Sequence, residues 1–507
     1  MPSYLHPGVY IEEIPSGSKP IEGVSTSVTA FVGAANRGPV GEPVLIGKFD
    51  DYINEFGQID SESDAMGLAV MAFYLNGGKA AYICRLAKSG HKTASVDIDG
   101  QRVDETAVIP IMTVSATSAG TWANSLFVKI ANSDVTARTF DLEIGTQATD
   151  GSFQAEESLV GLSMDPDSEN YVELRVPRES TLVAISVANS IPDDSGPDNT
   201  VSDGVSLSTD VSGVADAPVI GNYTSFYSDT LRKFRDVSII VLPNKDSTDT
   251  TFVDATVEFC SSNKRCMVIV DPAQNTELDS TTTGLPTSSY SALYYPWVLM
   301  ANPLYNEDTN PLANKTVAIP PSAIAAGMWA KIDGKRGVWK APAGVETRVS
   351  GVSELEFNVE DLEQDQLNPM GVNCIRKLPG YGAVVWGSRT LGTRADPEWR
   401  YVPVRRTAIF IEQSIFNGIQ WAVFEPNDHP LWGSLRANIG SFMDGLFRSG
   451  AFQGATAKEA YFVRCGLGDT MTQADIDRGQ VIVIVGFAAL KPAEFVIVRI
   501  QQKVGEK

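Results

Sequence analysis

The sequence predicts a multidomain protein of α/β and β domains, built on a central doubly wound sheet that a β-rich domain interrupts. The first observation is length, since 507 residues at roughly 150 per domain suggest about three domains. The second is that short apolar runs, such as 238–243 and 267–271, alternate with helical patterns, as in parallel sheets covered on both faces. The third is an acidic, β-rich stretch at 96–215 that separates two such regions.

The central α/β domain is expected in two parts, 26–95 and 216–369. In the first part, 26–33 and 82–86 read as strands, and 65–75 reads as a helix with one apolar face that ends at Gly77 and Gly78. In the second part we expect strands at 238–243 and 267–271 and a helix at 250–262. The apolar runs near 300 and 318 are expected to continue the same sheet.

The segment 96–215 is expected to form an inserted, acidic β domain. It holds 20 acidic and 5 basic residues, a net charge of −15 out of −22 for the chain. The alternating runs at 140–144 and 171–176 are expected strands. The turn-rich stretch 192–216 is expected to return the chain to the main sheet.

Residues 370–490 are expected to form an α+β C-terminal domain. The runs 382–389 and 407–415 look like strands, and 481–487 and 495–500 are β-rich. Between them, apolar residues recur at helical spacing, namely Leu431, Leu435, Ile439, Phe442 and Leu446. The flanking segments 1–25 and 491–507 are expected to be extended arms.

Composition excludes several classes of protein. The hydrophobic share of 43% and charged share of 20% are those of a globular chain. The charge of −22 argues against nucleic-acid binding, which needs a basic face. No apolar run approaches the ~20 residues of a membrane span, and the N-terminus lacks a secretion signal, so we expect no direct membrane insertion. Of five scattered cysteines only Cys260 and Cys266 are close, which favours buried or idle thiols.

The residues for catalysis or metal binding are scarce. The three histidines, His6, His91 and His429, do not lie at the spacing of a metal site or a catalytic triad. His429 does lie near Glu425 and Asp428, but we interpret this segment as a turn in which Asp428 or Asn427 caps the next helix. We therefore expect no catalytic residue, no metal and no enzyme.

Two glycine-containing segments resemble nucleotide-binding loops only superficially. In 326–337, Gly327 and Gly334 are seven apart instead of five, and Lys335 is followed by Arg336 where a phosphate loop has Ser or Thr. The segment 380–387 lacks the dinucleotide spacing and leads into a strand. We expect no cofactor.

A long, ordered series of segments is similar to the contractile tail sheath proteins of bacteriophages and related injection systems. At the N-terminal end these are PGVYIEE (7–13), TAFVGAANRGPVGEPVLI (29–46) and LNGGKAAYICRL (75–86). At the other end they are 368–391, 399–415, 421–428 and 491–500. The resemblance covers 1–95 and 216–507, about three quarters of the chain, and leaves out the acidic insertion.

The resemblance implies a structural role. The family's central domain is often compared with the subtilisin topology, without its proteolysis, and its C-terminal domain lines the inner wall of the sheath. The implied assembly is a helical stack of hexameric rings around a tail tube, which converts from an extended, metastable state to a contracted one. The implied partners are other copies of the chain, the tail tube protein, and the baseplate and tail terminator proteins. The implied location is the virion, after assembly in the host cytoplasm.

The family also implies that both arms complete sheets in neighbouring subunits. The residues that fit this role are Val9, Tyr10, Ile11 and Glu12 in the N-terminal arm and Phe495, Val496, Ile497 and Val498 in the C-terminal arm. Apolar strands at chain ends suit strand addition, because pairing satisfies their backbone and buries their side chains. The alternatives are an arm folded back on its own subunit and an ordinary central strand.

Other surfaces and roles stay open. Arg436 and Arg448, on the predicted helix from 431 to 448, are candidates to face an acidic tube, although a simple solvated helix face fits them equally. Flexible joints are expected at 15–20 and at Lys491 and Pro492. The alternative functions are the sheath of a headless bacteriocin or secretion machine and, more remotely, a hydrolase with a β accessory domain.

Overall fold

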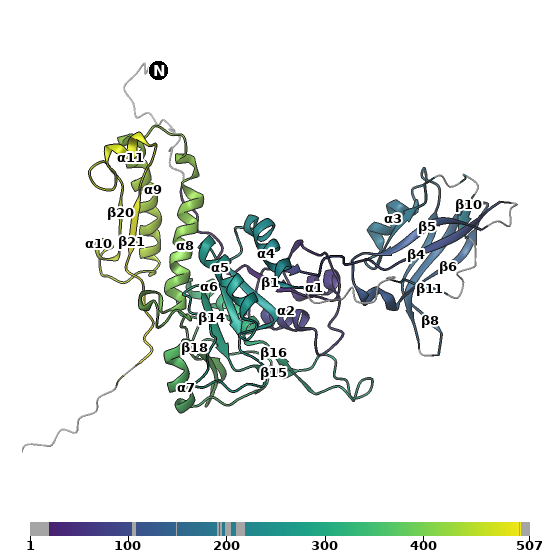
Figure 1. The fold of residues 1–507 in the computed structure, drawn as a ribbon, viewed down its shortest axis with the longest axis horizontal. Helices are drawn as coiled ribbons and strands as arrows, with labels where there is room; N and C mark the ends of the chain where they lie inside the picture. Colours follow the sequence, from purple (N-terminus) through teal and green to yellow (C-terminus); the bar gives the residue numbers. More distant parts are fainter. Residues whose placement is uncertain are drawn as a thin grey trace, which may run out of the picture. The chain divides into compact units, whose positions relative to one another are not determined.

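The computed structural model describes residues 20–103, 108–148, 150–189, 192, 195–197, 204–208, 218–495 and 497. The chain divides into two compact units, one of Ser25–Arg406 and one of Thr407–Lys507 with Met1–Val24. Each is taken by itself below (Figure 1).

The larger unit is organised around an eight-stranded sheet of order β19-β18-β14-β13-β12-β1-β3-β2. The six inner strands pair in parallel, and the outer strands β19 and β2 are antiparallel. Their bounds are β1 Thr29–Gly33, β2 Pro43–Ile46, β3 Ala81–Arg85, β12 Ile239–Asp246, β13 Met267–Asp271, β14 Ser291–Tyr295, β18 Val372–Leu378 and β19 Gly382–Val385. In chain order the parallel strands run 2-1-3-4-5-6 across the sheet, which extends the flavodoxin-like doubly wound order.

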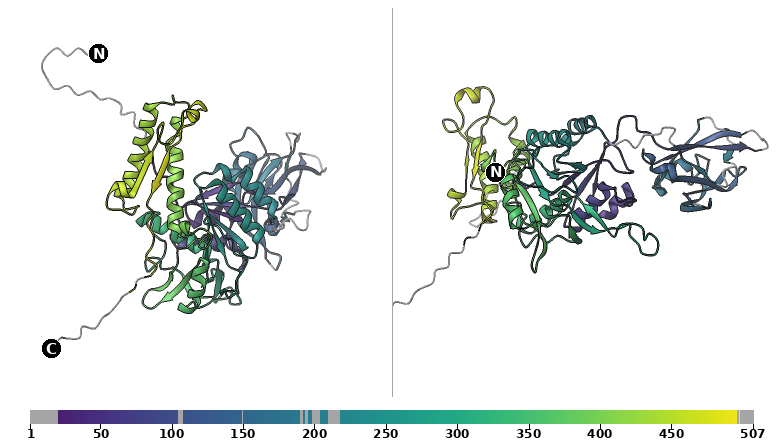
Figure 2. Two further views of the ribbon diagram at one scale, coloured as in Figure 1. Left: turned by 60° about the vertical axis from the view of Figure 1, so that its left-hand side comes forward. Right: turned by 60° about the horizontal axis from the view of Figure 1, so that its bottom comes forward.

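Helices cover both faces of this sheet, because successive side chains of its buried strands point to opposite sides (Figure 2). Against one face pack α2 (Ala65–Leu75) and α6 (Pro321–Arg336), where the Trp329 indole donates to the Tyr294 hydroxyl at 2.8 Å. Against the other pack α4 (Ile220–Asp229) and α5 (Thr250–Asn263), where Tyr227 stacks on Phe259 at 4.9 Å between ring centroids. The predicted mixed α/β class is confirmed.

Two apolar runs that we expected in this sheet lie elsewhere. The strands β15 (Val298–Ala301), β16 (Thr316–Ile319) and β17 (Val352–Leu355) form a separate antiparallel sheet of order β16-β15-β17. The expectation that they continue the parallel sheet was wrong, because only two residues separate β14 from β15 and a parallel neighbour needs a crossover of a dozen or more. The sequence analysis missed β14, the true neighbour of β13.

The insertion consists of two four-stranded antiparallel sheets that share one hydrophobic core. One sheet contains β10 (Ser195–Pro197), β4 (Ser95–Arg102), β5 (Val108–Ala116) and β9 (Val183–Val187), and the other β11 (Val205–Ser206), β6 (Leu126–Asp134), β7 (Thr139–Gln147) and β8 (Phe153–Ser163). The run 171–176, expected as a strand, begins helix α3 (Val172–Glu179). Val172 and Val176 are buried one helical turn apart while Leu174 is half exposed, so the period is that of a helix.

The smaller unit continues from helix α8 (Val402–Gly418), which begins in the larger unit. It contains α9 (His429–Arg448), α10 (Ala457–Ala460), β20 (Tyr461–Arg464), α11 (Gln473–Asp477) and β21 (Ile484–Phe487). The run 407–415, expected as a strand, lies within α8, and 372–385, expected in the C-terminal domain, forms β18 and β19 of the large sheet. The elements not yet given are α1 (Phe49–Phe56), α7 (Asp361–Leu367) and the 3-10 turns Thr121–Ser125, Leu231–Lys233, Asn368–Met370, Pro397–Trp399 and Gln420–Ala422.

Candidate functional site

The smaller unit contains a two-stranded antiparallel sheet whose two edges are open. β20 and β21 pair in register from Tyr461 opposite Phe487 to Arg464 opposite Ile484. Within the part of the chain that the structure describes, no third strand pairs with either of them. An isolated pair of strands is marginally stable in water, and its unpaired backbone groups form a template for another strand.

One face of this sheet is covered by helix α9. Tyr461 donates a hydrogen bond through its hydroxyl to the Gly440 carbonyl, at 3.3 Å. At one end of the sheet the Phe452 ring lies 5.6 Å from that of Phe487. Leu431 and Leu435 of α9 form a small core with Trp432, Cys465 and Met471, next to the end of β20. The sheet therefore has one supported face.

The opposite face is exposed, and it is apolar except for Arg464, which forms an ion pair with Asp469. Because strand side chains alternate, Phe462 and Ile484 point away from α9, and they are 49% and 42% exposed. The Phe462 ring lies over Gly486, where an added Cβ would stand 2.3 Å from a ring carbon. A large aromatic residue lying on a bare glycine backbone makes this face flat. Partly apolar on its outer face and without a third strand among the described residues, the sheet has the properties of a strand acceptor.

The predicted arm residues are only partly visible. Val9, Tyr10, Ile11, Glu12, Val496 and Val498 lie outside the described residues. Phe495 and Ile497 are described, and they are 73% and 79% exposed. The sequence analysis did not predict β20, whose only signal was the four-residue alternation YFVR.

The two arginines proposed to face a tube have different surroundings. Arg436 donates a hydrogen bond to the Cys465 carbonyl, so it ties α9 to the end of β20. Arg448, 78% exposed at its side chain, pairs with Asp444 one turn earlier at 2.7 Å. Surface pairs of this kind contribute little to stability, so Arg448 is the more available of the two for a partner.

The residues that first suggested chemistry have structural roles. Asp428 is the N-cap of α9 and accepts a hydrogen bond from the Leu431 amide, as predicted, while His429 packs against Trp432. The glycine segment 326–337 is part of helix α6 and not a phosphate-binding loop. The five cysteines are buried and free, as expected, with Cys260 and Cys266 sulfurs 3.5 Å apart.

A cavity of about 520 Å³ lies at the carboxyl ends of β12 and β13, where doubly wound folds commonly bind ligands. Its buried carboxyl group is Asp271, and burial raises the pKa of Asp271 to about 7. Both carboxyl oxygens accept hydrogen bonds from Ser322, from the amide at 2.7 Å and from the hydroxyl at 2.6 Å. Asp271 thus holds the start of α6, which is a structural role.

Two family models match the chain. The phage tail sheath central domain matches residues 222–391 and the phage tail sheath C-terminal domain matches residues 394–503, which together are more than half of the chain. The boundary between the two matches lies between β19 and α8.

Curated relatives match shorter stretches. A putative prophage major tail sheath protein of Pseudomonas aeruginosa (strain UCBPP-PA14) is 30% identical over 138 residues, which are 26% of this chain and 34% of that protein. The tail sheath protein of Enterobacteria phage T4 is 25% identical over 128 residues, which are 25% of this chain and 19% of that protein. The aligned regions thus span about a third or less of these relatives.

Solved sheath structures match almost the whole chain. The sheath complex of the extracellular contractile injection system PVC, in its contracted state, is 26% identical, with a TM-score of 0.59 and 99% of both chains covered. The helical sheath of the anti-feeding prophage, also contracted, is 25% identical, with a TM-score of 0.59 and coverage of 99% of this chain and 100% of that chain. A sheath tail protein from Listeria innocua shares the fold at 14% identity and a TM-score of 0.60.

The resemblance drawn from the sequence is therefore confirmed. The open strand pair of the C-terminal unit lies in the region that the C-terminal sheath model matches. The chain belongs to the family of contractile phage tail sheath proteins.

Proposed function

We propose that this protein is the structural subunit of a contractile sheath, which polymerises as a helical stack of rings around a tail tube. The proposed sheath is assembled in an extended, metastable state and contracts when the baseplate triggers it, which drives the tube through an envelope. The proposed partners are other copies of the chain, the tube protein, and baseplate and terminator proteins. This role needs extensive contacts between copies and no reaction chemistry.

The observation that carries the proposal is the open sheet β20–β21. A free edge can form backbone hydrogen bonds with an added strand. The outward-pointing side chains of that strand could then pack beside the exposed Phe462 and Ile484. The arm segments 9–12 and 495–498 have the length of β20, which is four residues. We propose that arms of neighbouring subunits add to this sheet and link the subunits into a continuous mesh.

We propose that the protein is not an enzyme. The Asp271 carboxyl group accepts hydrogen bonds from Ser322. Of its neighbours in the cavity, Asp246 accepts hydrogen bonds from Thr248, and Lys245 forms an ion pair with Asp249. The resemblance implies a subtilisin-like topology for the central domain, whereas its strand order 2-1-3-4-5-6 extends that of the flavodoxin-like class. The free energy for contraction would come from subunit packing.

A second candidate is the sheath of a headless injection machine. The observation that favours it is coverage, because the PVC and anti-feeding prophage sheaths match 99% of this chain, the insertion included. Electron microscopy of particles that carry this chain separates the two candidates. DNA-filled heads on the tails would establish the phage tail, and headless tails would establish the injection machine.

The function is tested by negative-stain electron microscopy of the purified chain and of a variant that lacks residues 1–20. We expect hollow helical tubes from the full chain and none from the truncated one. A matched control lacks only residues 501–507, which lie beyond the proposed strand residues 495–498 of the C-terminal arm, and should form tubes. Truncated chains that polymerise like the full chain would contradict the strand linkage.

A further inference from the structure

Three lysines gather on the C-terminal half of helix α6. Lys331 and Lys335 are four residues apart and therefore lie on the same face of the helix. Lys79, from the turn that follows α2, reaches this face between them, and its Nζ lies 3.0 Å from where a Cβ at Gly334 would stand. The segment is the same glycine-containing run, 326–337, that fails as a phosphate loop.

Two glycines make this gathering possible. Gly334 lies inside a helix, where glycine costs about 1 kcal/mol relative to alanine, and its missing Cβ leaves room for Lys79. Gly77 has a φ of +108°, and a Cβ there would stand 2.7 Å from the Cβ of Lys331. Close approach of the α2–β3 turn to α6 therefore depends on both glycines, and it places the Lys79 ammonium group against the part of α6 that carries Lys331 and Lys335.

The lysine cluster lacks ion-pair partners among the described residues. Within the described residues, no carboxylate forms an ion pair with Lys79, Lys331 or Lys335. The nearby Asp333 is buried in a pair with Arg406. Partial burial and, to a smaller extent, the charge of Lys335 lower the pKa of Lys331. Such a cluster is unfavourable in the isolated subunit and would be relieved by an acidic partner.

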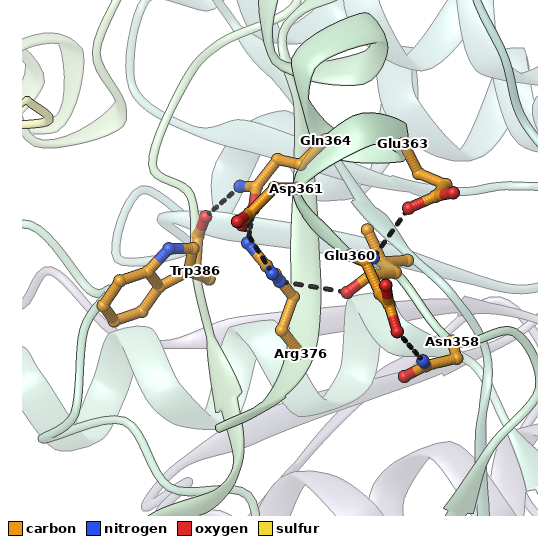
Figure 3. A network of polar contacts seen from close by, with 8 residues as sticks. Asn358, Glu360, Asp361, Glu363, Gln364, Arg376 and Trp386 are labelled. Carbon is orange, nitrogen blue, oxygen red and sulfur yellow. Dashed lines mark hydrogen bonds and ion pairs between the residues drawn. The ribbon is translucent and has the colours of Figure 1, made fainter. Parts of the chain in front are cut away.

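The same unit carries a group of carboxylates at helix α7, and Figure 3 shows the polar contacts that several of them make. Arg376 pairs with Asp361 at 2.9 Å, and Gln364 donates to the Trp386 carbonyl at 2.7 Å, so the helix is fixed on β18 and β19. Its other carboxylates have no cationic partner among the described residues; they are Glu360, Glu363 and Asp365.

Both surfaces also expose a leucine. Leu362 of α7 is 75% exposed, and Leu75, at the end of α2 near the lysine cluster, is 50% exposed. Interfaces between subunits typically have an apolar centre within a charged rim. Three cations without an ion-pair partner and a leucine on one surface thus match three carboxylates without a cationic partner and a leucine on the other.

We propose that the lysine cluster of one subunit binds helix α7 of a second copy of this chain. The inference rests on the proposed sheath function and assigns to it a second contact, separate from the arms. Because the two surfaces differ, the contact is heterologous and can repeat along a polymer. A nucleic-acid ligand for the lysines is disfavoured by the net charge of −22.

Charge swaps test this contact in the full chain. The variants are Lys79→Glu with Lys335→Glu, Glu360→Lys with Asp365→Lys, and the combination of all four; the altered side chains are exposed. Each double variant turns two attractions into repulsions, so the critical concentration for tube formation should rise about tenfold, which corresponds to about 1.4 kcal/mol. The fourfold variant should restore it to near the wild-type value. Lys92→Glu, at another exposed lysine, serves as the control and should change it less than about twofold.

The outcomes separate this inference from the sheath function itself. Two results would overturn the contact and leave the sheath function intact. One is a fourfold variant whose critical concentration stays as high as that of the double variants. The other is a Lys92→Glu control whose critical concentration rises as much as that of the lysine double variant. If the wild-type chain forms no tubes, zero-length carbodiimide cross-linking decides, with the cross-link read by mass spectrometry. A bond between Lys335 of one copy and Asp365 of another supports the contact, and its absence refutes it. Binding of a labelled DNA duplex that needs Lys79 and Lys335, with tubes unaffected, would assign the lysines to nucleic acid instead.

Discussion

The pair formed by Asp333 and Arg406 provides the sharpest test of how the larger unit is held together. Both side chains are almost fully buried, at 5% and 4% exposed, and Arg406 donates to the two carboxylate oxygens at 2.9 and 2.6 Å. Thr26 joins through its hydroxyl, which donates to Asp333, and its carbonyl, which accepts from Arg406. The guanidinium also lies 4.6 Å above the Trp329 ring. The network therefore links three parts of the larger unit, namely the segment just before β1, helix α6 and the start of α8.

Removal of one partner leaves the other charge buried and unpaired. We expect Asp333→Asn or Arg406→Met to lower the free energy of unfolding by about 3–5 kcal/mol. The double variant Asp333→Leu with Arg406→Met should recover most of this loss, because a buried ion pair and an apolar pair of similar volume are often equally stable. The cost thus comes from the unpaired charge and not from lost packing.

Urea unfolding followed by tryptophan fluorescence measures this effect, since Trp329 lies directly beneath Arg406. With a urea dependence of about 3 kcal/mol per M, a loss of 3–5 kcal/mol lowers the midpoint by about 1–1.7 M. The measurement uses protein concentrations at which no polymer sediments. Single variants within about 1 kcal/mol of wild type, or a double variant worse than both singles, would refute the reasoning.

Three further predictions concern other sites. Burial raises the pKa of Asp271 to about 7 in the folded chain, above its unfolded value near 4. The free energy of unfolding should therefore fall by up to about 4 kcal/mol as pH rises from 4 to 7. In urea titrations at several pH values, Asp271→Asn should remove this dependence on pH. Gly486→Val should displace Phe462 and abolish tube formation while circular dichroism stays unchanged; normal tubes would show that the outer face is not an acceptor. If α9 faces the tube, Arg448→Glu should weaken co-sedimentation with tube protein severalfold more than Arg436→Met does. Equal binding by the wild-type chain and both variants would indicate a solvated helix face.

Much of the large sheet could be predicted from the sequence. The apolar runs that form β12 and β13 are short and continuous, which is typical of strands buried on both faces, and the structure places both at the centre of the parallel sheet. The helix predicted for 65–75 coincides with α2, because its apolar face and terminating glycines are local signals.

The failures arose where tertiary packing decides. The β-branched and aromatic run 407–415 favours a strand locally, yet Ile409 and Ile411 are buried within helix α8. β14 was missed since its sequence, SALYY, is short and contains only two strong strand formers, and only pairing with β13 and β18 selects its structure.

The candidate site was predictable in part. The apolar arms at 9–12 and 495–498 are visible in the sequence, but their acceptor is not, because β20 and β21 are four residues each and their exposed face depends on Phe462 lying over Gly486. The lysine cluster escaped notice for the same reason, since Lys79 and Lys335 are far apart along the chain and only the packing of α2 on α6 brings them together.

The central claim, that arms of one subunit add to the β20–β21 sheet of another, is tested most directly by disulfide trapping. A chain with Ile11→Cys and Ile484→Cys is assembled and oxidised, with the two single variants as controls; the five native cysteines are buried. The account predicts a ladder of covalently linked multimers from the double variant alone. Cross-linked monomers, formed within one chain, or no cross-link in well-formed tubes would contradict it.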